Sequence, residues 1–337
     1  LQICTFLRHS RRSAVLTCGL MILVLAGCSS NEVDPDDLPA ELVSFEPTLK
    51  VRKLWSKGIG SGTENLRLAL RPTEHGSTIF AAAHDGTVMA LDAASGKKRW
   101  EANTDLPLSS GPATDGELVV AGSSNGDVIA LDAATGEFRW AVTVTSEVVV
   151  PGKVIIRTVN GKLAALDSAT GATLWTIQQS MPRLSVRGTS APVVSGNMVI
   201  CGFDNGRVTA VDISDGAIIW DVLLEAPSGR TAIERLVDVN SSVQIAGGDV
   251  YVVGYQGRLG AIALESGQLL WSRELSSYNG LALDINTIFV TDQRSDLVAL
   301  SRASGRELWR RKDLRNRDVS GPAVIGSSVV VGDFEGY

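Results

Sequence analysis

The chain has 337 residues, of which 34 are glycine and only 5% are aromatic. Its many valine-rich runs are bounded by Gly, Asn and Asp, and this composition favours an all-β fold with frequent tight turns. Acidic residues outnumber basic ones by 37 to 31, and such a negative surface argues against nucleic acid or anionic lipid headgroups as the main partner.

The first 27 residues have the organisation of a bacterial signal peptide. A basic stretch with three arginines precedes an apolar run from Ala14 to Ala26, which is too short to span a bilayer comfortably. The sequence Leu-Ala-Gly at 25–27 is followed by Cys28 and resembles the lipobox of bacterial lipoproteins. The resemblance implies cleavage before Cys28 and lipidation of that residue with several acyl chains, which anchor stably. An ordinary cleaved signal with a chance cysteine is the alternative.

The residues after Cys28 predict where the mature protein goes. Ser29 and Ser30 follow, without an aspartate. By resemblance to lipoprotein sorting rules, this favours transfer to the periplasmic face of the outer membrane. We expect residues 28–48 to form the lipidated N-terminus and a linker, and residues 49–337 to form the main domain.

Cysteine usage excludes a disulfide framework. Cys4 and Cys18 leave with the leader and Cys28 carries lipid, so Cys201 is expected to be the single free thiol of the mature chain.

Internal repetition dominates the rest of the chain. The repeated unit has the form Gly-x-(Val/Leu)-x-Ala-Leu-Asp-x-x-(Ser/Thr)-Gly-x-x-x-Trp, and its tryptophans recur at intervals of about 35 to 50 residues. Such a period predicts a β-propeller in which each repeat forms one blade. Four clear copies and two weaker ones lie at 86–100, 126–140, 161–175, 206–220, 257–271 and 295–309.

Each copy is interpreted as a hairpin, a turn and a further strand. The Asp-Gly or Asn-Gly pair that opens a copy predicts a type I′ turn, which needs positive φ at both central positions. The Asp of Ala-Leu-Asp is expected to accept hydrogen bonds from nearby amides in a turn that closes at the next Gly. Metal ligation by these aspartates is the alternative. The opening pairs are Asp85-Gly86, Asn125-Gly126, Asn160-Gly161 and Asn205-Gly206, and the capping aspartates are Asp92, Asp132, Asp167 and Asp212.

The tryptophans share one position in the repeat or its equivalent. A large ring that recurs in every copy predicts packing between blades, where it buries apolar area. An aromatic binding surface is the alternative. The seven are Trp55, Trp100, Trp140, Trp175, Trp220, Trp271 and Trp309.

The repeat region begins and ends with an incomplete copy of the repeat, and the two incomplete copies complement each other. Trp55 has no Gly-to-Asp half before it, and Gly336 opens such a half with no tryptophan after it. Completing both halves predicts an eight-bladed propeller of four-stranded antiparallel blades, in which N-terminal and C-terminal strands share one sheet. We therefore expect about one further blade and a closing strand, roughly 40 to 60 residues, beyond Tyr337.

The copies resemble the repeats of pyrroloquinoline quinone (PQQ) enzymes, whose blades carry a similar Asp-to-Trp pattern. This makes a PQQ-dependent periplasmic dehydrogenase the alternative function. Those enzymes are longer, and they use a cofactor disc, a bound calcium, a catalytic aspartate and often a vicinal disulfide. The mature chain has no cysteine pair, and His75 and His84 are interpreted as surface or turn residues. We therefore expect no catalytic residue, metal or cofactor.

A closer resemblance covers nearly the whole mature chain. It depends on the lipobox and on three stretches of sequence. The stretches are Glu-Pro-Thr-Leu-Lys-Val-Arg-Lys-Leu-Trp at 46–55, Met-Pro-Arg-Leu-Ser-Val-Arg-Gly-Thr-Ser-Ala-Pro at 181–192 and Val-Val-Gly-Asp-Phe-Glu-Gly-Tyr at 330–337. Together these features resemble the BamB family, the propeller lipoproteins of the outer-membrane β-barrel assembly (BAM) machine. The repeats alone would be unspecific.

The resemblance implies a function and a site. Members of that family are lipid-anchored periplasmic scaffolds that bind the periplasmic (POTRA) domains of the central barrel subunit, BamA. They assist the folding and insertion of outer-membrane β-barrel proteins, and direct contact with nascent chains stays open. Carried over to this chain, the partner-binding residues are Leu184, Val186 and Arg187 in one loop and Asp238 in a second segment. Family members can carry a second acid where this chain has Asn240.

The residue types fit an interface. Exposed aliphatics that flank an arginine supply a desolvated anchor and a cation with several donors, which are common at the centre of protein interfaces. A sheet edge of the partner could add backbone hydrogen bonds. The alternatives are ordinary loop packing for Leu184 and Val186, and a solvated surface charge for Arg187.

Overall fold

The computed structural model divides the chain into two compact units, Leu1–Pro39 and Ala40–Tyr337. A short 3-10 turn, η1 (Pro35–Asp37), lies in the first unit, and every assigned strand lies in the second. No helix in the described part of the chain is long and apolar enough to cross a membrane. The structure describes residues 35–43, 52–62, 66, 68, 70–143, 147–150 (backbone only), 152–158, 160–180, 182, 190–226, 230–231, 238–239 and 243–336.

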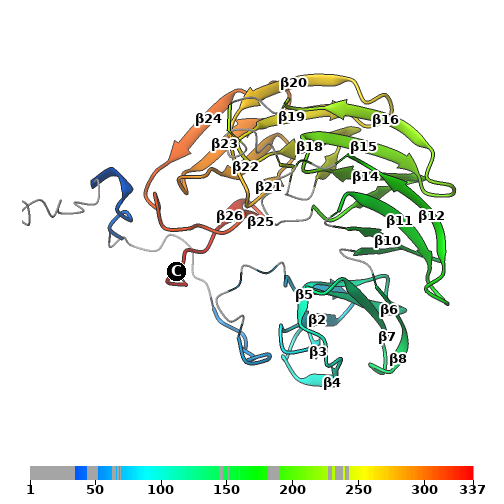
Figure 1. Ribbon diagram of the computed structural model, residues 1–337. Helices are drawn as coiled ribbons and strands as arrows, with labels where there is room; N and C mark the ends of the chain where they lie inside the picture. Colours follow the sequence, from blue (N-terminus) through cyan, green and yellow to red (C-terminus); the bar gives the residue numbers. More distant parts are fainter. Residues whose placement is uncertain are drawn as a thin grey trace, which may run out of the picture. The chain divides into compact units, whose positions relative to one another are not determined.

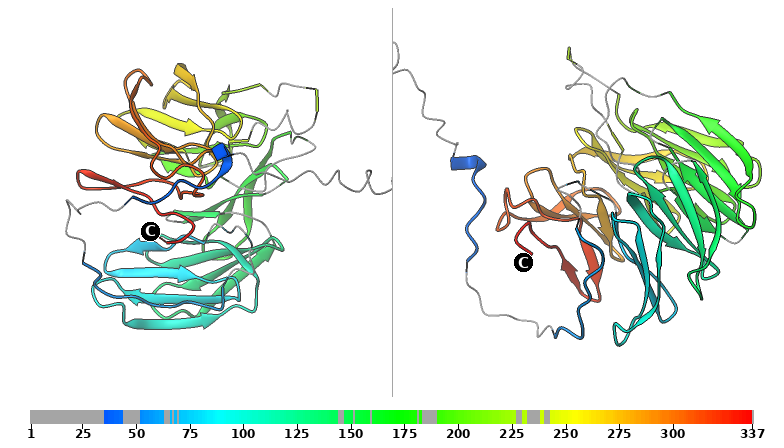
Figure 2. Two further views of the ribbon diagram at one scale, coloured as in Figure 1. Left: turned by 90° about the vertical axis from the view of Figure 1, so that its left-hand side faces the viewer. Right: turned by 60° about the horizontal axis from the view of Figure 1, so that its bottom comes forward.

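The second unit is a β-propeller of antiparallel sheets that follow one another around a ring (Figure 1). The boundary at residue 49 expected from the sequence stays a prediction. Each four-stranded sheet is a simple meander, with its last strand at the outer edge. Figure 2 shows from two further sides that sheets adjacent in the sequence are also adjacent in space.

The first three sheets are formed by residues 73–178. The first contains β1 (Thr73–His75), β2 (Thr78–Ala82), β3 (Thr87–Asp92) and β4 (Lys98–Asn103). The second contains β5 (Leu108–Thr114), β6 (Leu118–Ser123), β7 (Asp127–Asp132) and β8 (Phe138–Thr143). The third contains β9 (Glu147–Val150), β10 (Lys153–Arg157), β11 (Lys162–Asp167) and β12 (Thr173–Gln178).

The remaining sheets continue the same order. The fourth contains β13 (Val193–Ser195), β14 (Met198–Gly202), β15 (Arg207–Asp212) and β16 (Ile218–Leu223). The fifth contains β17 (Gln244–Ala246), β18 (Asp249–Val253), β19 (Arg258–Ala263) and β20 (Leu269–Glu274). The sixth contains β21 (Leu281–Leu283), β22 (Thr287–Thr291), β23 (Leu297–Ser301) and β24 (Glu307–Arg311), and a strand pair, β25 (Ala323–Ile325) and β26 (Ser328–Val330), follows it. The all-β propeller expected from the sequence is therefore confirmed, and the count of eight blades stays a prediction.

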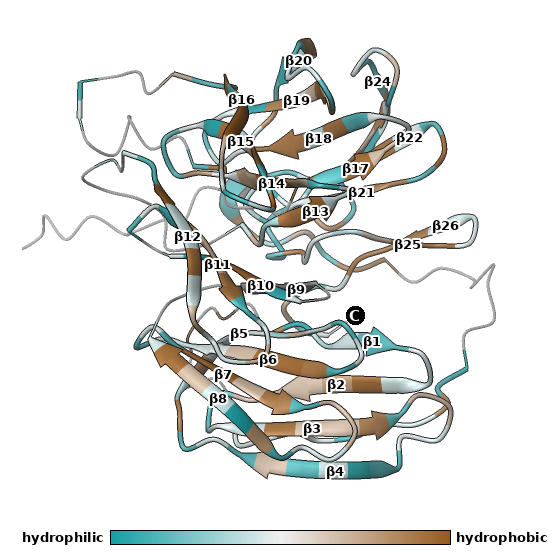
Figure 3. Ribbon diagram, turned by 90° about the vertical axis from the view of Figure 1, so that its right-hand side faces the viewer, coloured by the Kyte–Doolittle hydropathy of each residue, from teal (hydrophilic) through white to brown (hydrophobic). Residues whose placement is uncertain are grey.

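The apolar core lies between neighbouring sheets. In the described residues each apolar cluster joins two consecutive sheets; Phe80 and Trp100 of the first, for example, pack against Leu108, Val119 and Ile129 of the second. Because the middle strands are covered on both faces, their sequences are nearly continuous apolar runs, which Figure 3 shows in brown. The outer strands are mostly exposed, and Trp140 is the one buried residue of β8.

Six of the seven tryptophans dock onto the turn that joins the last two strands of the following sheet. In each case the indole Nε1 donates a hydrogen bond to a backbone carbonyl of that turn, and the ring lies against the glycine that closes the turn. A Cβ added at any of these glycines would lie 2.5 to 3.1 Å from a ring atom. The six bonds run from Trp55 to Ala93, Trp100 to Ala133, Trp140 to Ser168, Trp175 to Ile213, Trp220 to Leu264 and Trp271 to Arg302, at 2.7 to 3.0 Å.

The hairpin turns differ from the expected type. Gly86, Gly126 and Gly206 have positive φ, but the preceding Asp or Asn residue does not. The type I′ prediction is therefore wrong for these three turns. In each, the glycine amide instead donates a hydrogen bond to the carbonyl three residues earlier, as from Gly86 N to Ala83 O at 3.1 Å. This is the pattern of a type I turn followed by a left-handed glycine, which leaves the register of the hairpin intact.

Candidate partner-binding face

The described parts of the connections between sheets lie at the same end of the propeller as the central hairpin turns; we call this end the loop face. The connections are joined to the turns by backbone bonds, such as Thr104 N to Gly86 O at 2.9 Å and Leu224 N to Gly206 O at 2.9 Å. The connections occupy residues 104–107, 144–146, 179–192, 224–243, 275–280 and 312–322. The two longest flank the fourth sheet.

The residues predicted to bind a partner belong to these two connections. Leu184, Val186 and Arg187 of the first, and Asn240 of the second, lie outside the described residues, as does Cys28. Asp238 is described and is fully buried, at 0% exposed. Its backbone pairs with the fifth sheet through Tyr255 N, which donates to Asp238 O at 2.8 Å. A direct role for the Asp238 carboxylate stays a prediction, and its burial favours a supporting role.

The structure brings both connections onto a single turn, residues 203–206 between β14 and β15. From the first connection, the carbonyl of Ser180 accepts a hydrogen bond from Asn205 Nδ2 at 3.0 Å. From the second, Val239 N donates to Phe203 O at 3.2 Å. A Cβ at Gly202 would lie 2.3 Å from Val239 Cγ1, so the second connection can only approach because residue 202 is glycine. We call residues 203–206 the central turn.

Sequence reasoning did not identify the central turn as part of the site. Asn205 and Gly206 were assigned only to a hairpin, because the same dipeptide opens other repeats. Gln179 Nε2 also donates to Thr209 Oγ1, at 3.1 Å, and adds a second contact between the first connection and the fourth sheet. The signal available in the sequence is the unusual length of the connections on either side of this sheet.

The repeated aspartates lie at the opposite end of the propeller. Asp132 Oδ1 accepts hydrogen bonds from Ala134 N at 2.9 Å and from Thr135 N at 2.8 Å. The Arg139 side chain, which bonds Asp132 Oδ2, lowers the pKa of Asp132 to about 2, together with these amides. The Ser95 hydroxyl and the Arg99 side chain likewise lower the pKa of Asp92 to about 2.

Asp167 and Asp212 have the same geometry. Asp167 Oδ1 accepts from Thr170 N at 2.9 Å, and Asp212 Oδ1 accepts from Ser214 N at 2.7 Å. The four carboxylates therefore bind amides of their own turns. No group of three or more metal-ligating side chains occurs in the part of the chain that the structure describes.

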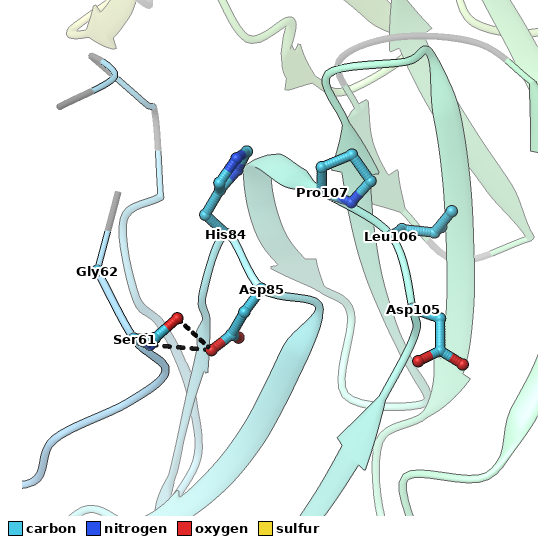
Figure 4. Close-up of a pocket in the computed structure, with 7 residues that line it drawn as sticks. All are labelled: Ser61, Gly62, His84, Asp85, Asp105, Leu106 and Pro107. Atoms are coloured by element: carbon cyan, nitrogen blue, oxygen red, sulfur yellow. Dashed lines mark hydrogen bonds between the residues drawn. The ribbon is translucent and has the colours of Figure 1, made fainter. Parts of the chain in front are cut away.

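A hollow on the loop face lies where the segment around Ser61 packs on the first sheet. Figure 4 shows Asp85 directed toward Ser61, whose backbone N and Oγ donate to Asp85 Oδ2 at 2.9 and 3.1 Å. The amide of Thr87 also bonds this carboxylate, and these contacts lower the pKa of Asp85, with Thr87 as the main cause. The arrangement holds the 60–62 segment in place. The hollow is lined by Ser61, Gly62, His84, Asp85, Asp105, Leu106 and Pro107.

The thiol of Cys201 is not positioned for chemistry. Cys201 is fully buried on β14, and burial raises the pKa of its thiol to about 12. A thiol that stays protonated and out of solvent is a poor nucleophile and a poor metal ligand. Among the described residues, the candidate site consists of the central turn and the two connection residues that bond it, Ser180 and Val239.

Comparisons with known proteins point to one family. The family model for outer membrane protein assembly factor BamB matches residues 51–311. A relative of that name from Pseudomonas aeruginosa is 40% identical over 322 residues, which cover 94% of this chain and 84% of the relative. Another, from Bordetella pertussis, is 34% identical and covers 98% of this chain and 87% of the relative.

A solved structure shows the same fold. The crystal structure of BamB from Moraxella catarrhalis superimposes with a TM-score of 0.74 at 29% sequence identity, over 80% of this chain and 83% of that chain. The names of these relatives describe assembly factors, which favours that function over the dehydrogenase alternative. This chain belongs to the family of outer membrane protein assembly factor BamB.

Proposed function

We propose that the protein is a lipid-anchored scaffold of the BAM complex, on the periplasmic face of the outer membrane. Cys28 carries the anchor, and the propeller binds the POTRA domains of BamA to assist the folding and insertion of outer-membrane β-barrel proteins. The family membership supports the assembly role, and the lipobox-like sequence at 25–28 supports the anchor.

The observation that carries the choice of site is the meeting of two connections on the central turn. Leu184, Val186 and Arg187 lie between Ser180 and Ser190 in the sequence, and Ser180 is bonded to Asn205. Asp238 immediately precedes Val239, which is bonded to Phe203. Two segments that are far apart in the sequence therefore contact the same turn. A contiguous binding surface requires that the segments contributing to it meet in this way.

Binding at this surface is expected to depend on a few side chains. Interface energy is commonly concentrated in an arginine or a large apolar anchor that loses its water on binding. Arg187 can donate several hydrogen bonds to acceptors on the partner, and Leu184 and Val186 can exclude water around it. The positions fall outside the Gly-to-Trp repeat, so no hairpin and no inter-sheet core needs them.

The test is a titration of the purified protein with the BamA periplasmic domains. Arg187→Ala combined with Leu184→Ala should lower affinity by about thirtyfold or more, equivalent to about 2 kcal/mol, because a central anchor is lost. The melting temperature should change little, since a surface substitution alters stability by about 0.5 kcal/mol.

Two control variants sharpen this result. Leu174→Ala and Arg306→Ala remove an exposed leucine on β12 and an exposed arginine away from the loop face, and both should bind like the wild type. Equal affinities for all variants would exclude the assigned residues. A large fall in melting temperature for the double variant would assign Leu184 and Arg187 to packing.

A further inference from the structure

A buried ion pair crosses from the third sheet to the fourth beneath the central turn. Arg157, the last residue of β10, is 0% exposed, and Asp204 of the central turn is 3% exposed. Arg157 Nη2 donates a hydrogen bond to Asp204 Oδ1. The guanidinium carbon also lies 5.2 Å from the centroid of the Phe203 ring.

The repeats provide an internal control for this pair. In every four-stranded sheet but the second, the amide of the residue just after the second strand donates to a carbonyl across the hairpin, as in Thr158 N to Lys162 O and Phe203 N to Arg207 O. The strand register gives Ser123 as the equivalent residue of the second sheet. The residue before that position is Arg157 in the third sheet. In the first, second, fourth, fifth and sixth sheets it is Ala82, Gly122, Gly202, Val253 and Thr291. An arginine at this register is therefore not a requirement of the blade.

Stability alone is a poor explanation for the pair. Removing two charges from water is costly, and apolar residues of similar volume often replace a buried ion pair without loss of stability. The cost is increased because Arg157 Nε and Nη1 have no hydrogen-bond partner among the described residues. A buried ion pair that the fold does not need is better explained by the geometry it imposes, since an ion pair has one favoured arrangement and an apolar contact has many.

The geometry imposed is that of the central turn. Asp204 is held by Arg157, and its two neighbours make the contacts to the long connections: Phe203 O accepts from Val239 N, and Asn205 Nδ2 donates to Ser180 O. The two contacts therefore start from residues on either side of Asp204 in one short turn.

We propose that Arg157 and Asp204 form a positioning pair that fixes the central turn, and with it the relative placement of Ser180 and Val239, and so preorganises the partner-binding surface. The inference deepens the proposed function and depends on it for the identity of the partner. The ion pair does not contact the partner, because both side chains are buried. A preformed surface binds more tightly, since fewer degrees of freedom are lost on association.

The experiment replaces the pair with apolar residues of similar shape, Arg157→Met with Asp204→Leu, in the full mature chain. We expect the melting temperature to stay near that of the wild type, while affinity for the BamA periplasmic domains falls about tenfold. The backbone amide of Val239 should exchange with solvent faster, since its acceptor, Phe203 O, is no longer held. The single variant Arg157→Lys keeps Asp204 and a positive charge at residue 157. Its affinity should therefore lie between that of the double variant and that of the wild type.

A matched control uses a second buried ion pair far from the central turn. Arg317→Met with Asp333→Leu removes a pair whose side chains are 6% and 0% exposed, and it should leave affinity and Val239 exchange unchanged. If the Arg157 and Asp204 double variant folds and keeps wild-type affinity and exchange, the proposal is overturned.

Two further outcomes are decided separately. If the double variant does not fold, Asp204→Ala removes both acceptor oxygens that Arg157 can use, and wild-type exchange at Val239 in that variant would equally overturn the proposal. If the wild-type protein does not bind the BamA domains at all, the proposed function fails, and exchange at Val239 still tests the positioning role.

Discussion

A tryptophan ring joins two neighbouring sheets through a hydrogen bond from its indole N–H and through packing on a glycine. This pair of contacts recurs around the propeller. Trp140 is 7% exposed, donates to Ser168 O at 2.7 Å and covers Gly171 of the next turn. Trp309 has the equivalent sequence position but is 40% exposed. The same residue type therefore has different surroundings within one chain, which allows a direct comparison.

Trp140→Ala should lower the free energy of unfolding by about 3 to 5 kcal/mol, because it opens a cavity between two sheets. Trp309→Ala should cost about 1 kcal/mol, the average for a point substitution. Urea denaturation of both variants measures the difference. Equal effects would mean that burial of the ring between sheets does not determine its contribution.

The aspartate turns make stability depend on pH in the acid range. The pKa of Asp132 is about 2 in the folded protein and about 3.9 when unfolded. Because the folded pKa is the lower one, ionised Asp132 stabilises the fold above pH 4, and this stabilisation is lost as pH falls from about 4 to 2. Asp132→Asn should therefore be less stable than wild type at pH 7, and the difference should shrink through that range. Thermal melts at pH 7, 4 and 2 check this expectation.

At the scale of elements, the turn that closes each repeat has a conformational role and a packing role. Gly136 has a φ of 77° and faces the Trp100 ring, where an added Cβ would lie 2.6 Å from Cε3. Gly76 has a φ of 60° in a hairpin with open space around it. Comparing alanine substitutions at the two positions distinguishes the cost of backbone strain from the cost of displacing the tryptophan ring.

Gly136→Ala should destabilise more than Gly76→Ala. Both substitutions place a Cβ in the left-handed region, which costs about 1 to 2 kcal/mol. Only the first also displaces a tryptophan ring. The midpoints of chemical unfolding give the two values, and a Gly76→Ala effect as large as that of Gly136→Ala would assign the whole cost to backbone strain.

At the scale of the whole molecule, the beginning and end of the propeller unit meet at one loop. Ala40 N donates to Arg315 O at 2.9 Å, and Arg317 Nη1 donates to Ala40 O at 2.9 Å. Arg317 is itself held by Asp333, with Nε and Oδ2 2.7 Å apart. Ala40, which precedes the first sheet in the chain, is thus held by the connection that follows the sixth sheet.

Cys28→Ala should leave the protein uncleaved before residue 28 and release it from membranes, because processing and anchoring both depend on that cysteine in the lipobox interpretation. Fractionation of cells and the mass of the mature chain measure both effects. Cys201→Ala, at the buried thiol, serves as the control and should stay membrane-bound. A Cys28→Ala protein that is processed and anchored normally would refute the lipid anchor.

The repeat and the propeller class could be predicted from the sequence, because each depends on a pattern that recurs along the chain. The partner-binding segments follow from the family resemblance and stay a prediction. Tertiary structure decided the rest. Arg157 at the end of a strand resembles any solvated charge until Asp204 is brought against it, and Gly202 resembles any strand glycine until Val239 packs on it. The burial of Asp238 has the same origin. These features depend on contacts between segments far apart in the sequence, and the cost of burying a charge or closing a gap exists only once the sheets are assembled.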